Sequence, residues 1–363
     1  MKTNKKMLMK GNEALAEAAI IAGCKGYFGY PITPQSEILE YMSLHLNNRG
    51  GVFIQAESEV ASINMVYGAA GTGERVMTST SSPGYSLMQE GVSYIACAEL
   101  PCLLVNVVRG GPGLGTIQPA QGDYFQAVKG GGHGDYRLLV YAPNSVQEMA
   151  DFVFKGFDAA DRYRNPVLIL ADGALGQMME PVIFPDYDPK KNRIDHSDWA
   201  TRGKQMDEDR HIITTLHLEP QKMEKINNNL QEKYRDITAN EVMFESIQID
   251  DADFLLVAFG LTARVAHKAV ELVREEGIKV GLLRPQTLFP FPSLALAEIA
   301  ENVQAIMTVE MNAGQMVEDV RLAVNGKVPV YFYGRMGGVI PQPDEIANRV
   351  KQVYHSKLKQ TIS

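Results

Sequence analysis

An alternation of strand-like and helix-like segments constrains the fold of this chain more than any other feature. Residues 103–108 are almost all apolar, as expected for a strand buried on both faces. Similar short segments alternate with helical patterns from Met9 to Asp172. Strands that alternate with helices form a parallel sheet covered on both sides, so the sequence predicts an α/β fold. The expected strands are 27–30, 52–55, 75–80, 103–108, 138–141 and 167–170, and the expected helices are 13–24, 58–70, 85–99 and 146–163.

The alternation of strand and helix patterns is interrupted between Pro181 and about Asn240, where polar and charged residues predominate. We expect this segment to be a linker or an excursion over the surface, with a helix near 222–234. The alternation then resumes, with strands expected at 254–258, 280–283, 305–309 and 328–332 and helices at 261–276, 293–299 and 316–324. The sequence therefore predicts an α/β domain over residues 1–185, a polar linker over 186–245 and a smaller α/β domain over 246–363.

Composition and charge argue against several classes of protein. The formal net charge of −8 argues against nucleic-acid binding, which usually requires a basic face. The apolar runs are too short to span a bilayer and residues 1–10 do not resemble a signal peptide, so we expect a cytoplasmic protein without membrane contact. Cys24, Cys97 and Cys102 lack the spacing of a metal or cluster motif. We expect buried free thiols and no metal site in this chain.

The segment 29–37 combines a strand end, two prolines and the start of a helix. Pro31 suits the end of a strand because it lacks a backbone donor. Thr33 and Pro34 are expected to be the N-cap and the first residue of a helix. Sharp turns of this kind, at the carboxyl ends of strands, are where α/β proteins place ligands. The apolar residues that follow at helical spacing are Ile38, Leu39, Met42 and Leu46.

Two charged positions follow expected strands. An acidic residue in the first turn of a helix complements the helix dipole, and this explanation covers either Glu57 or Glu59 without a function. Glu59 is nevertheless a candidate site residue, because the helix that it opens has unusually small side chains that a ligand could approach closely. Arg109 ends a buried strand, where it is suited to hold a carboxylate or phosphate in bidentate fashion. A solvated charge at a strand end explains Arg109 equally well.

Four further loops are weaker candidates for a site. The glycine run 110–115 is not followed directly by a helix, so a mobile active-site loop fits better than a dinucleotide fingerprint. The hydroxyls of 80–86 are expected to cap a helix, and His133 in a glycine-rich loop is given no catalytic role. Asp172 and Gly173 resemble the metal–diphosphate motif of thiamine enzymes, but the required asparagine is missing about 25–30 residues later. We infer that this chain does not itself hold the diphosphate.

Several of these motifs together resemble the α subunit of 2-oxoacid:ferredoxin oxidoreductases. The resemblance spans nearly the whole chain, and the Tyr-Pro-Ile-Thr-Pro block is its most specific part. It implies a pyrimidine-binding-type domain followed by a smaller transketolase C-terminal-like domain. The matching stretches are 30–34, 55–59, 80–84, 106–112, 282–290 and 309–315.

The resemblance implies roles for four residues. Glu59 would hydrogen-bond a pyrimidine nitrogen of thiamine and favour the imino tautomer that accepts the thiazolium proton. Thr33 would meet the keto-acid end of the substrate through its hydroxyl. Arg109 would hold the carboxylate of the 2-oxoacid, and Pro31 would lie against the cofactor. The choice of Glu59 over Glu57 stays open at this point.

The implied reaction is oxidative decarboxylation of a 2-oxoacid to an acyl-CoA and CO2, with reduction of ferredoxin. The implied partners are a β subunit that carries the diphosphate, Mg²⁺ and a [4Fe-4S] cluster, a ferredoxin-like cluster subunit and possibly a γ subunit. The residues around Gln35 and Gly113 resemble those of the branched-chain enzymes, which favours 2-oxoisovalerate as the substrate over 2-oxoglutarate. The second carboxylate of 2-oxoglutarate would also require another cation beside these loops, and none is obvious there. A nucleotide-binding oxidoreductase and a non-catalytic scaffold subunit remain as alternatives.

Overall fold

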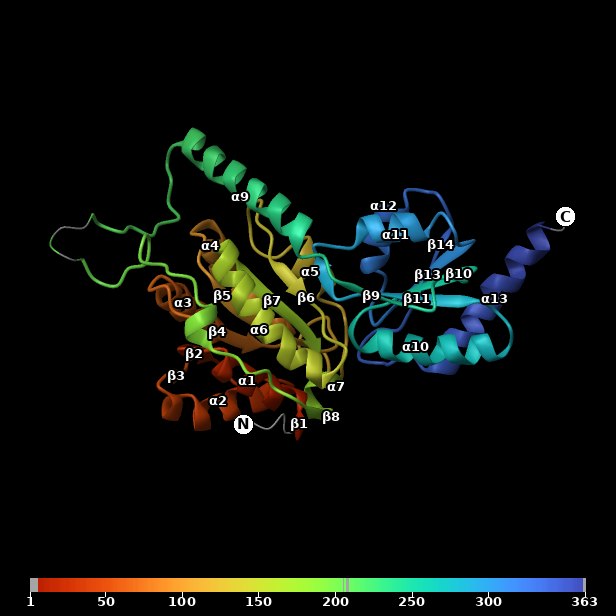
Figure 1. Ribbon diagram of the computed structural model, residues 1–363, viewed down its shortest axis with the longest axis horizontal. Helices are drawn as coiled ribbons and strands as arrows, with labels where there is room; N and C mark the ends of the chain where they lie inside the picture. Colours follow the sequence, from red (N-terminus) through yellow and green to blue (C-terminus); the bar gives the residue numbers. More distant parts are fainter. Residues whose placement is uncertain (1–5, 205, 207–208, 362–363) are drawn as a thin grey trace.

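The computed structural model describes residues 6–204, 206 and 209–361, which form two lobes, each built around its own sheet (Figure 1). The first lobe has a seven-stranded sheet in the order β12-β6-β7-β5-β4-β2-β3. All neighbours in it are parallel except β12, which pairs antiparallel with β6. This is the predicted α/β arrangement. Its strands are β2 (Gly26–Gly29), β3 (Val52–Gln55), β4 (Val76–Thr80), β5 (Cys102–Val108), β6 (Leu139–Tyr141), β7 (Pro166–Asp172) and β12 (Thr287–Phe289).

Helices cover both faces of this sheet, which explains why β5 is apolar along its whole length. Leu103 and Val105 belong to one apolar core, whereas Leu104 and Val108 belong to the other. Successive side chains of a strand point to opposite faces, so each face of β5 packs against its own helices. The helices of this lobe are α1 (Gly11–Ile21), α2 (Ser36–His45), α3 (Glu59–Ala70), α4 (Ser82–Cys97), α5 (Tyr124–Val128), α6 (Val146–Tyr163) and α7 (Gly173–Gln177).

The second lobe has a five-stranded sheet in the order β14-β13-β10-β11-β9, in which β9 alone is antiparallel to its neighbour. The helix α13 extends from its outer end (Figure 1). The elements are β9 (Phe244–Ile247), β10 (Phe254–Val257), α10 (Gly260–Glu275), β11 (Val280–Pro285), α11 (Ser293–Ile299), β13 (Ala305–Glu310), α12 (Met316–Val324), β14 (Val330–Gly334) and α13 (Pro343–Thr361). Within the described residues, no helix combines the length and the apolar character needed to cross a membrane.

Buried polar contacts join the two lobes. The side chain of Gln121 is 3% exposed; its Nε2 donates to the Phe259 carbonyl at 2.8 Å and its Oε1 accepts from Thr262 Oγ1 at 3.0 Å. Arg284 donates to both carboxylate oxygens of Glu148, at 2.8 and 2.7 Å. Because each group has a partner across the junction, the lobes are fixed relative to each other by directional bonds as well as by the strand pair β12–β6.

The segment between the lobes contains a longer helix than expected. The helix α9 (Pro220–Asn240) extends past both ends of the predicted 222–234, and it lies along the first lobe (Figure 1). Leu230, Tyr234 and Ile237 are buried in the core of that lobe.

An antiparallel strand pair was not predicted from the sequence: β1 (Met7–Lys10) pairs with β8 (Met179–Val182). The chain also forms two short helices, η1 (Asn47–Arg49) and α8 (Pro189–Asn192).

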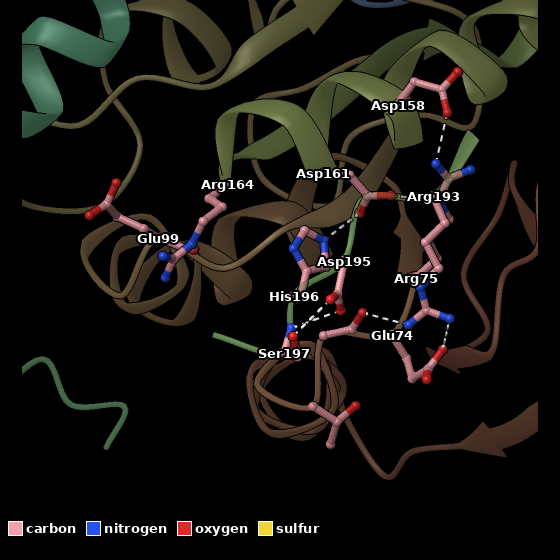
Figure 2. A network of polar contacts seen from close by, with 12 residues as sticks. Glu74, Arg75, Glu99, Asp158, Asp161, Arg164, Arg193, Asp195, His196 and Ser197 are labelled. Atoms are coloured by element: carbon pink, nitrogen blue, oxygen red, sulfur yellow. Dashed lines mark hydrogen bonds and ion pairs between the residues drawn. The ribbon is translucent and has the colours of Figure 1, made fainter. Parts of the chain in front are cut away.

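A buried ionic network holds the segment that follows β8 against the first lobe (Figure 2). Arg75 directly precedes β4 and donates from Nε to Asp161 at 2.8 Å and from Nη2 to Asp158 at 2.7 Å. Its Nη1 donates to the Ala22 carbonyl at 2.9 Å and to the Tyr187 hydroxyl at 2.7 Å. His196 Nε2 lies 3.4 Å from Asp161, so the network reaches both ends of the segment 187–196.

The predicted start of α2 is wrong. The helix begins at Ser36, with Gln35 at the N-cap and not Thr33, and the Thr33–Pro34 peptide bond is cis. The reason is that the preceding residues form a tight turn of their own, closed by a hydrogen bond from Gln35 N to the Ile32 carbonyl at 3.1 Å. The predicted apolar face of this helix is confirmed, because all four of its members are buried: Ile38, Leu39, Met42 and Leu46.

Candidate active site

The loops that carry the candidate residues leave the carboxyl ends of the central strands. In the sheet order, β3 lies on one side of β2 and β4 on the other, so the direction of the winding changes between β2 and β4. Ligands of α/β sheets bind in the crevice at such a switch point. Thr33 follows β2, Glu59 follows β3 and Arg109 follows β5. The topology therefore gathers them at one edge of the sheet.

Arg109 joins two of these loops. Its Nη1 donates to the Thr33 carbonyl at 3.0 Å, and its backbone N–H donates to Ser82 Oγ at 3.1 Å. Ser82 is the first residue of α4, and its own N–H donates to Asn106 Oδ1 at 2.9 Å. Arg109 is 9% exposed, and its Nε is buried without a partner. The guanidinium therefore keeps an unused donor, and Pro31 and Thr33 in the turn after β2 are exposed.

Glu59 is the first residue of α3 and is 5% exposed, whereas Glu57 is exposed. Ser58 caps the helix, because its Oγ accepts from Ala61 N at 3.2 Å. Glu59 is therefore not needed as a cap. Among the described residues, its carboxylate has no hydrogen-bond or ion-pair partner. Burial of most of this side chain without a partner leaves its carboxylate available to a group from outside the chain's own packing.

The absence of a side chain at Gly84 lets the helix α4 pack directly against this carboxylate. A Cβ on Gly84, in the first turn of α4, would lie 2.4 Å from Glu59 Oε1 and 2.2 Å from Thr80 Oγ1. Near it, Thr80 Oγ1 and Ser81 Oγ are fully buried without hydrogen-bond partners in the described part of the chain. Buried polar atoms are normally paired, so several unpaired ones around one glycine are typical of a site that a ligand completes.

Replacing Gly84 by alanine tests the closeness of this packing. We expect the new methyl group to displace Glu59 or Thr80 and to lower the free energy of unfolding by about 1–3 kcal/mol. Gly68 of α3 is a matched control, since a Cβ there would meet nothing within 4 Å. Gly68→Ala should be neutral or stabilising by up to about 1 kcal/mol, because alanine favours a helix over glycine. Thermal unfolding of both variants measures the difference, and equal melting temperatures would contradict the packing described.

A cavity of about 560 Å³ adjoins this region between the two lobes. Its walls include Ser82, Pro112 and Asp123 from the first lobe and Asn312 from the second. Burial raises the pKa of Asp123, whose Oδ2 accepts from Asn106 Nδ2 at 2.8 Å. The cavity is of the size that small ligands occupy, and it opens next to the loop after Arg109.

The remaining loops have structural explanations. Asp172 caps α7, because its carboxylate accepts from Ala174 N at 2.9 Å and from Leu175 N at 3.2 Å, and burial raises its pKa to about 6. The glycine loop closes on itself through Gly110 N to the Gln118 carbonyl at 2.9 Å, and no helix opens before Tyr124 in this described part of the chain. The local geometry of a dinucleotide fingerprint is thus missing there.

The prediction that hydroxyls of 80–86 cap α4 is wrong. Ser81 is the N-cap but forms no side-chain cap bond, and the Ser82 hydroxyl is used by the backbone of Arg109. Sequence reasoning also missed Gly84 and Asn106. A glycine in the first turn of a helix does not by itself indicate a functional site. Asn106 is the one polar residue of an otherwise apolar strand, and its position there does not indicate a function.

The chain matches two family descriptions. Residues 17–246 match "Pyruvate flavodoxin/ferredoxin oxidoreductase, thiamine diP-bdg" and residues 252–346 match "Pyruvate:ferredoxin oxidoreductase core domain II". Among curated proteins, the ketoisovalerate oxidoreductase subunit VorB of Methanothermobacter thermautotrophicus is 51% identical over 95% of this chain and 97% of its own length. The 2-oxoglutarate synthase subunit KorA of Methanothermobacter marburgensis is 37% identical over 94% of this chain and 97% of its own length.

Solved structures agree with these matches. A 2-oxoglutarate:ferredoxin oxidoreductase from Magnetococcus marinus, solved with 2-oxoglutarate, coenzyme A and succinyl-CoA, superposes with a TM-score of 0.85 at 28% identity. The match covers 96% of this chain and 65% of that one. A split-gene transketolase at 14% identity and a TM-score of 0.59, covering 95% of this chain and 97% of its own, supports the fold alone. The resemblance inferred from the sequence is thus confirmed, and the chain belongs to the 2-oxoacid:ferredoxin oxidoreductase family as an oxidoreductase subunit with a thiamine-diphosphate-binding-type domain.

Proposed function

We propose that this chain supplies the pyrimidine-facing and oxoacid-facing wall of a thiamine-dependent 2-oxoacid:ferredoxin oxidoreductase. The observation that carries the proposal is the Glu59 side chain, which is 5% exposed, has no partner among the described residues and packs against Gly84. A carboxyl group in that environment is suited to bond a ring nitrogen of the cofactor and to share a proton with it. When bound, thiamine supplies the carbon nucleophile on which decarboxylation depends. Pro31, exposed at the turn after β2, would lie against the cofactor.

Arg109 and Thr33 would orient the substrate. With Nη1 engaged by the Thr33 carbonyl, the unpaired Nε and the remaining guanidinium donors are left for the carboxylate of a 2-oxoacid. The Thr33 hydroxyl would meet the keto-acid end. Because one residue holds the other, the carboxylate-binding donor and the hydroxyl keep a fixed separation, which is the condition for presenting the carbonyl in an attackable orientation.

The proposed substrate is the branched-chain 2-oxoacid 2-oxoisovalerate. Support comes from the 51% identity to a ketoisovalerate oxidoreductase subunit, against 37% for a 2-oxoglutarate synthase subunit. The loop 110–118 after Arg109 contains no lysine or arginine that could bind a second carboxylate, and it exposes Leu114 and Ile117 instead. An apolar loop of this kind favours a hydrocarbon side chain over the distal carboxylate of 2-oxoglutarate.

The rest of the active complex would come from other chains. We propose a β subunit that holds the diphosphate, Mg²⁺ and a [4Fe-4S] cluster, a ferredoxin-like cluster subunit, possibly a γ subunit, ferredoxin as electron acceptor and coenzyme A as acyl acceptor. In support, Asp172 is used inside this chain as a helix cap. The three free cysteines suit the reducing cytoplasm. We keep the division into 1–185, 186–245 and 246–363 as a proposal for the chain's domains.

The complex purified with its partner subunits tests this function. With thiamine diphosphate, coenzyme A and ferredoxin supplied, we expect ferredoxin reduction to depend on a 2-oxoacid, with a kcat/KM for 2-oxoisovalerate at least about tenfold above that for 2-oxoglutarate. The reverse preference would overturn the substrate assignment. Absence of reduction with every 2-oxoacid, in a complex that is shown to be fully assembled and loaded with clusters, would overturn the function.

A further inference from the structure

The turn between β2 and α2 is held by side-chain donors, of which Gln35 belongs to the turn and Arg109 and Asn12 come from elsewhere in the first lobe. One backbone bond, from Gln35 N to the Ile32 carbonyl, closes it. The carbonyls of Tyr30, Thr33 and Pro34 accept from the side chains of Gln35, Arg109 and Asn12, respectively. We propose that Gln35 and Asn12 are positioning residues that set the orientation of this turn and thereby place Thr33. The chemical consequence rests on the function proposed above.

Gln35 ends a directional chain of buried hydrogen bonds. Its Oε1 accepts from Ser79 Oγ at 2.5 Å, and its Nε2 donates to the Tyr30 carbonyl at 3.2 Å. Because the single proton of Ser79 is given to Gln35, the Tyr27 hydroxyl, 2.6 Å away, is the donor to Ser79. Tyr27, Ser79 and Gln35 are all fully buried. The chain therefore ties the turn to β2 and β4 at the switch point, and it needs an acceptor and a donor on the same side chain.

Asn12 anchors the other end of the turn. It is fully buried in α1, and its Nδ2 donates to the Pro34 carbonyl at 2.8 Å and to Glu37 Oε2 at 2.8 Å. A Cβ on Gly176 would lie 2.5 Å from Asn12 Oδ1, so α7 approaches this amide as closely as glycine allows. Glu37 is held in turn by two bonds from Gln177, at 2.7 and 2.8 Å. These contacts fix the donor that Pro34 uses.

The two anchors bond the carbonyls of Tyr30 and Pro34, which lie on either side of Thr33 along the chain. Without Asn12, the buried Pro34 carbonyl would keep only the longer bond from Gln177 Nε2, at 3.5 Å, and without Gln35 the Tyr30 carbonyl would lose its side-chain donor. Either loss would allow the turn to rotate about its remaining bonds. A displacement of about 1 Å at a substrate-orienting group can lower the rate about 100-fold. The proposed role thus differs from simple packing, because it depends on hydrogen-bond donation and not on side-chain volume.

The test uses Gln35→Glu, Gln35→Met and Asn12→Ala in the complex with its partner subunits. We expect kcat/KM for the 2-oxoacid to fall about ten- to 100-fold in each variant. Gln35→Glu distinguishes the loss of hydrogen bonding from a change of side-chain shape. In its neutral form the new carboxyl group offers a donor and an acceptor, as the glutamine amide does. Burial favours the neutral form, so the activity of Gln35→Glu relative to the unmodified complex should rise as the pH falls, whereas Gln35→Met should show no such rise.

Two measurements separate the possible failures. Hydrogen exchange of the peptide 30–36 should be faster in all three variants, and this readout needs no cofactor or substrate. Gln147→Met is the control, because Gln147 similarly bonds the backbone of Ile183 but belongs to no part of the proposed site, and its activity should be unchanged. Normal kcat/KM in the Gln35 and Asn12 variants would overturn this inference alone. An unmodified complex inactive on every 2-oxoacid would overturn the function instead.

Discussion

Glu59→Gln is expected to lower 2-oxoacid-dependent ferredoxin reduction by about 10²- to 10⁴-fold, the usual contribution of a positioned acid or base. The amide keeps the shape of the side chain but cannot share a proton with the ring nitrogen of the cofactor. Because the Glu59 carboxylate has no partner within the described residues, the variant removes no hydrogen bond of the chain itself. The expected change is therefore in catalysis and not in folding.

Glu57→Gln is the matched control. Glu57 lies two residues earlier and is exposed, so its replacement should leave turnover unchanged. Both variants should keep the melting temperature and the subunit composition of the unmodified complex. Glu57 is a surface position, where substitutions usually change stability by less than about 0.5 kcal/mol, and Glu59→Gln keeps the shape of the side chain and breaks no hydrogen bond among the described residues. Near-normal turnover in Glu59→Gln, or a comparable loss in Glu57→Gln, would contradict the assigned role of Glu59.

The elements with a strong local pattern were predictable from the sequence. The helix Val146–Tyr163 and the strand Val52–Gln55 have the expected bounds, because side-chain periodicity and flanking turns specify them locally. Pairings between distant segments were not predictable in this way. The strand β12 joins the sheet of the first lobe from the far end of the sequence, and its three residues carry no pattern that names β6 as their partner.

The candidate residues were predictable as positions, but their relations were not. Strand ends pointed to Thr33 and Arg109, yet the hydrogen bond between them depends on the parallel order of β2, β4 and β5. The prediction of Thr33 as the N-cap failed because the residues before Ser36 form a turn instead, and two distant side chains, Arg109 and Asn12, bond the carbonyls of that turn. Glu59 is buried and Glu57 is exposed. The sequence does not predict this difference, because both are acidic residues near the start of the same helix.

The contacts that hold residues 187–196 after β8 could not be predicted from the sequence, because the ionic network that Tyr187 and His196 join is centred on residues outside this segment. Burial acts to lower the pKa of Arg75, but Asp161 and Tyr187 outweigh it and raise the pKa, so the guanidinium stays charged. Its acidic partners are carried by α6, more than eighty residues later in the chain. A single arginine at the start of a strand gives no sign of such a network, which forms only when α6 packs against the sheet.

Arg75→Met is expected to lower the free energy of unfolding of the first lobe by about 3–5 kcal/mol, the cost of removing one partner from a buried ion pair. Arg75 and Asp161 have side chains that are 2% and 3% exposed, so the remaining carboxylate cannot regain water. The Ala22 carbonyl loses a donor at the same time. Urea unfolding followed by circular dichroism measures the loss.

A second arginine of the same network provides the comparison (Figure 2). Arg193 pairs with Glu74 at 2.8 Å, but these side chains are 30% and 36% exposed, so Arg193→Met should cost no more than about 1 kcal/mol. The double variant Arg75→Met, Asp161→Asn should recover part of the loss of Arg75→Met, since it removes the unpaired charge. Equal losses for Arg75 and Arg193, or a double variant less stable than Arg75→Met, would show that the buried charge is not the source of the effect.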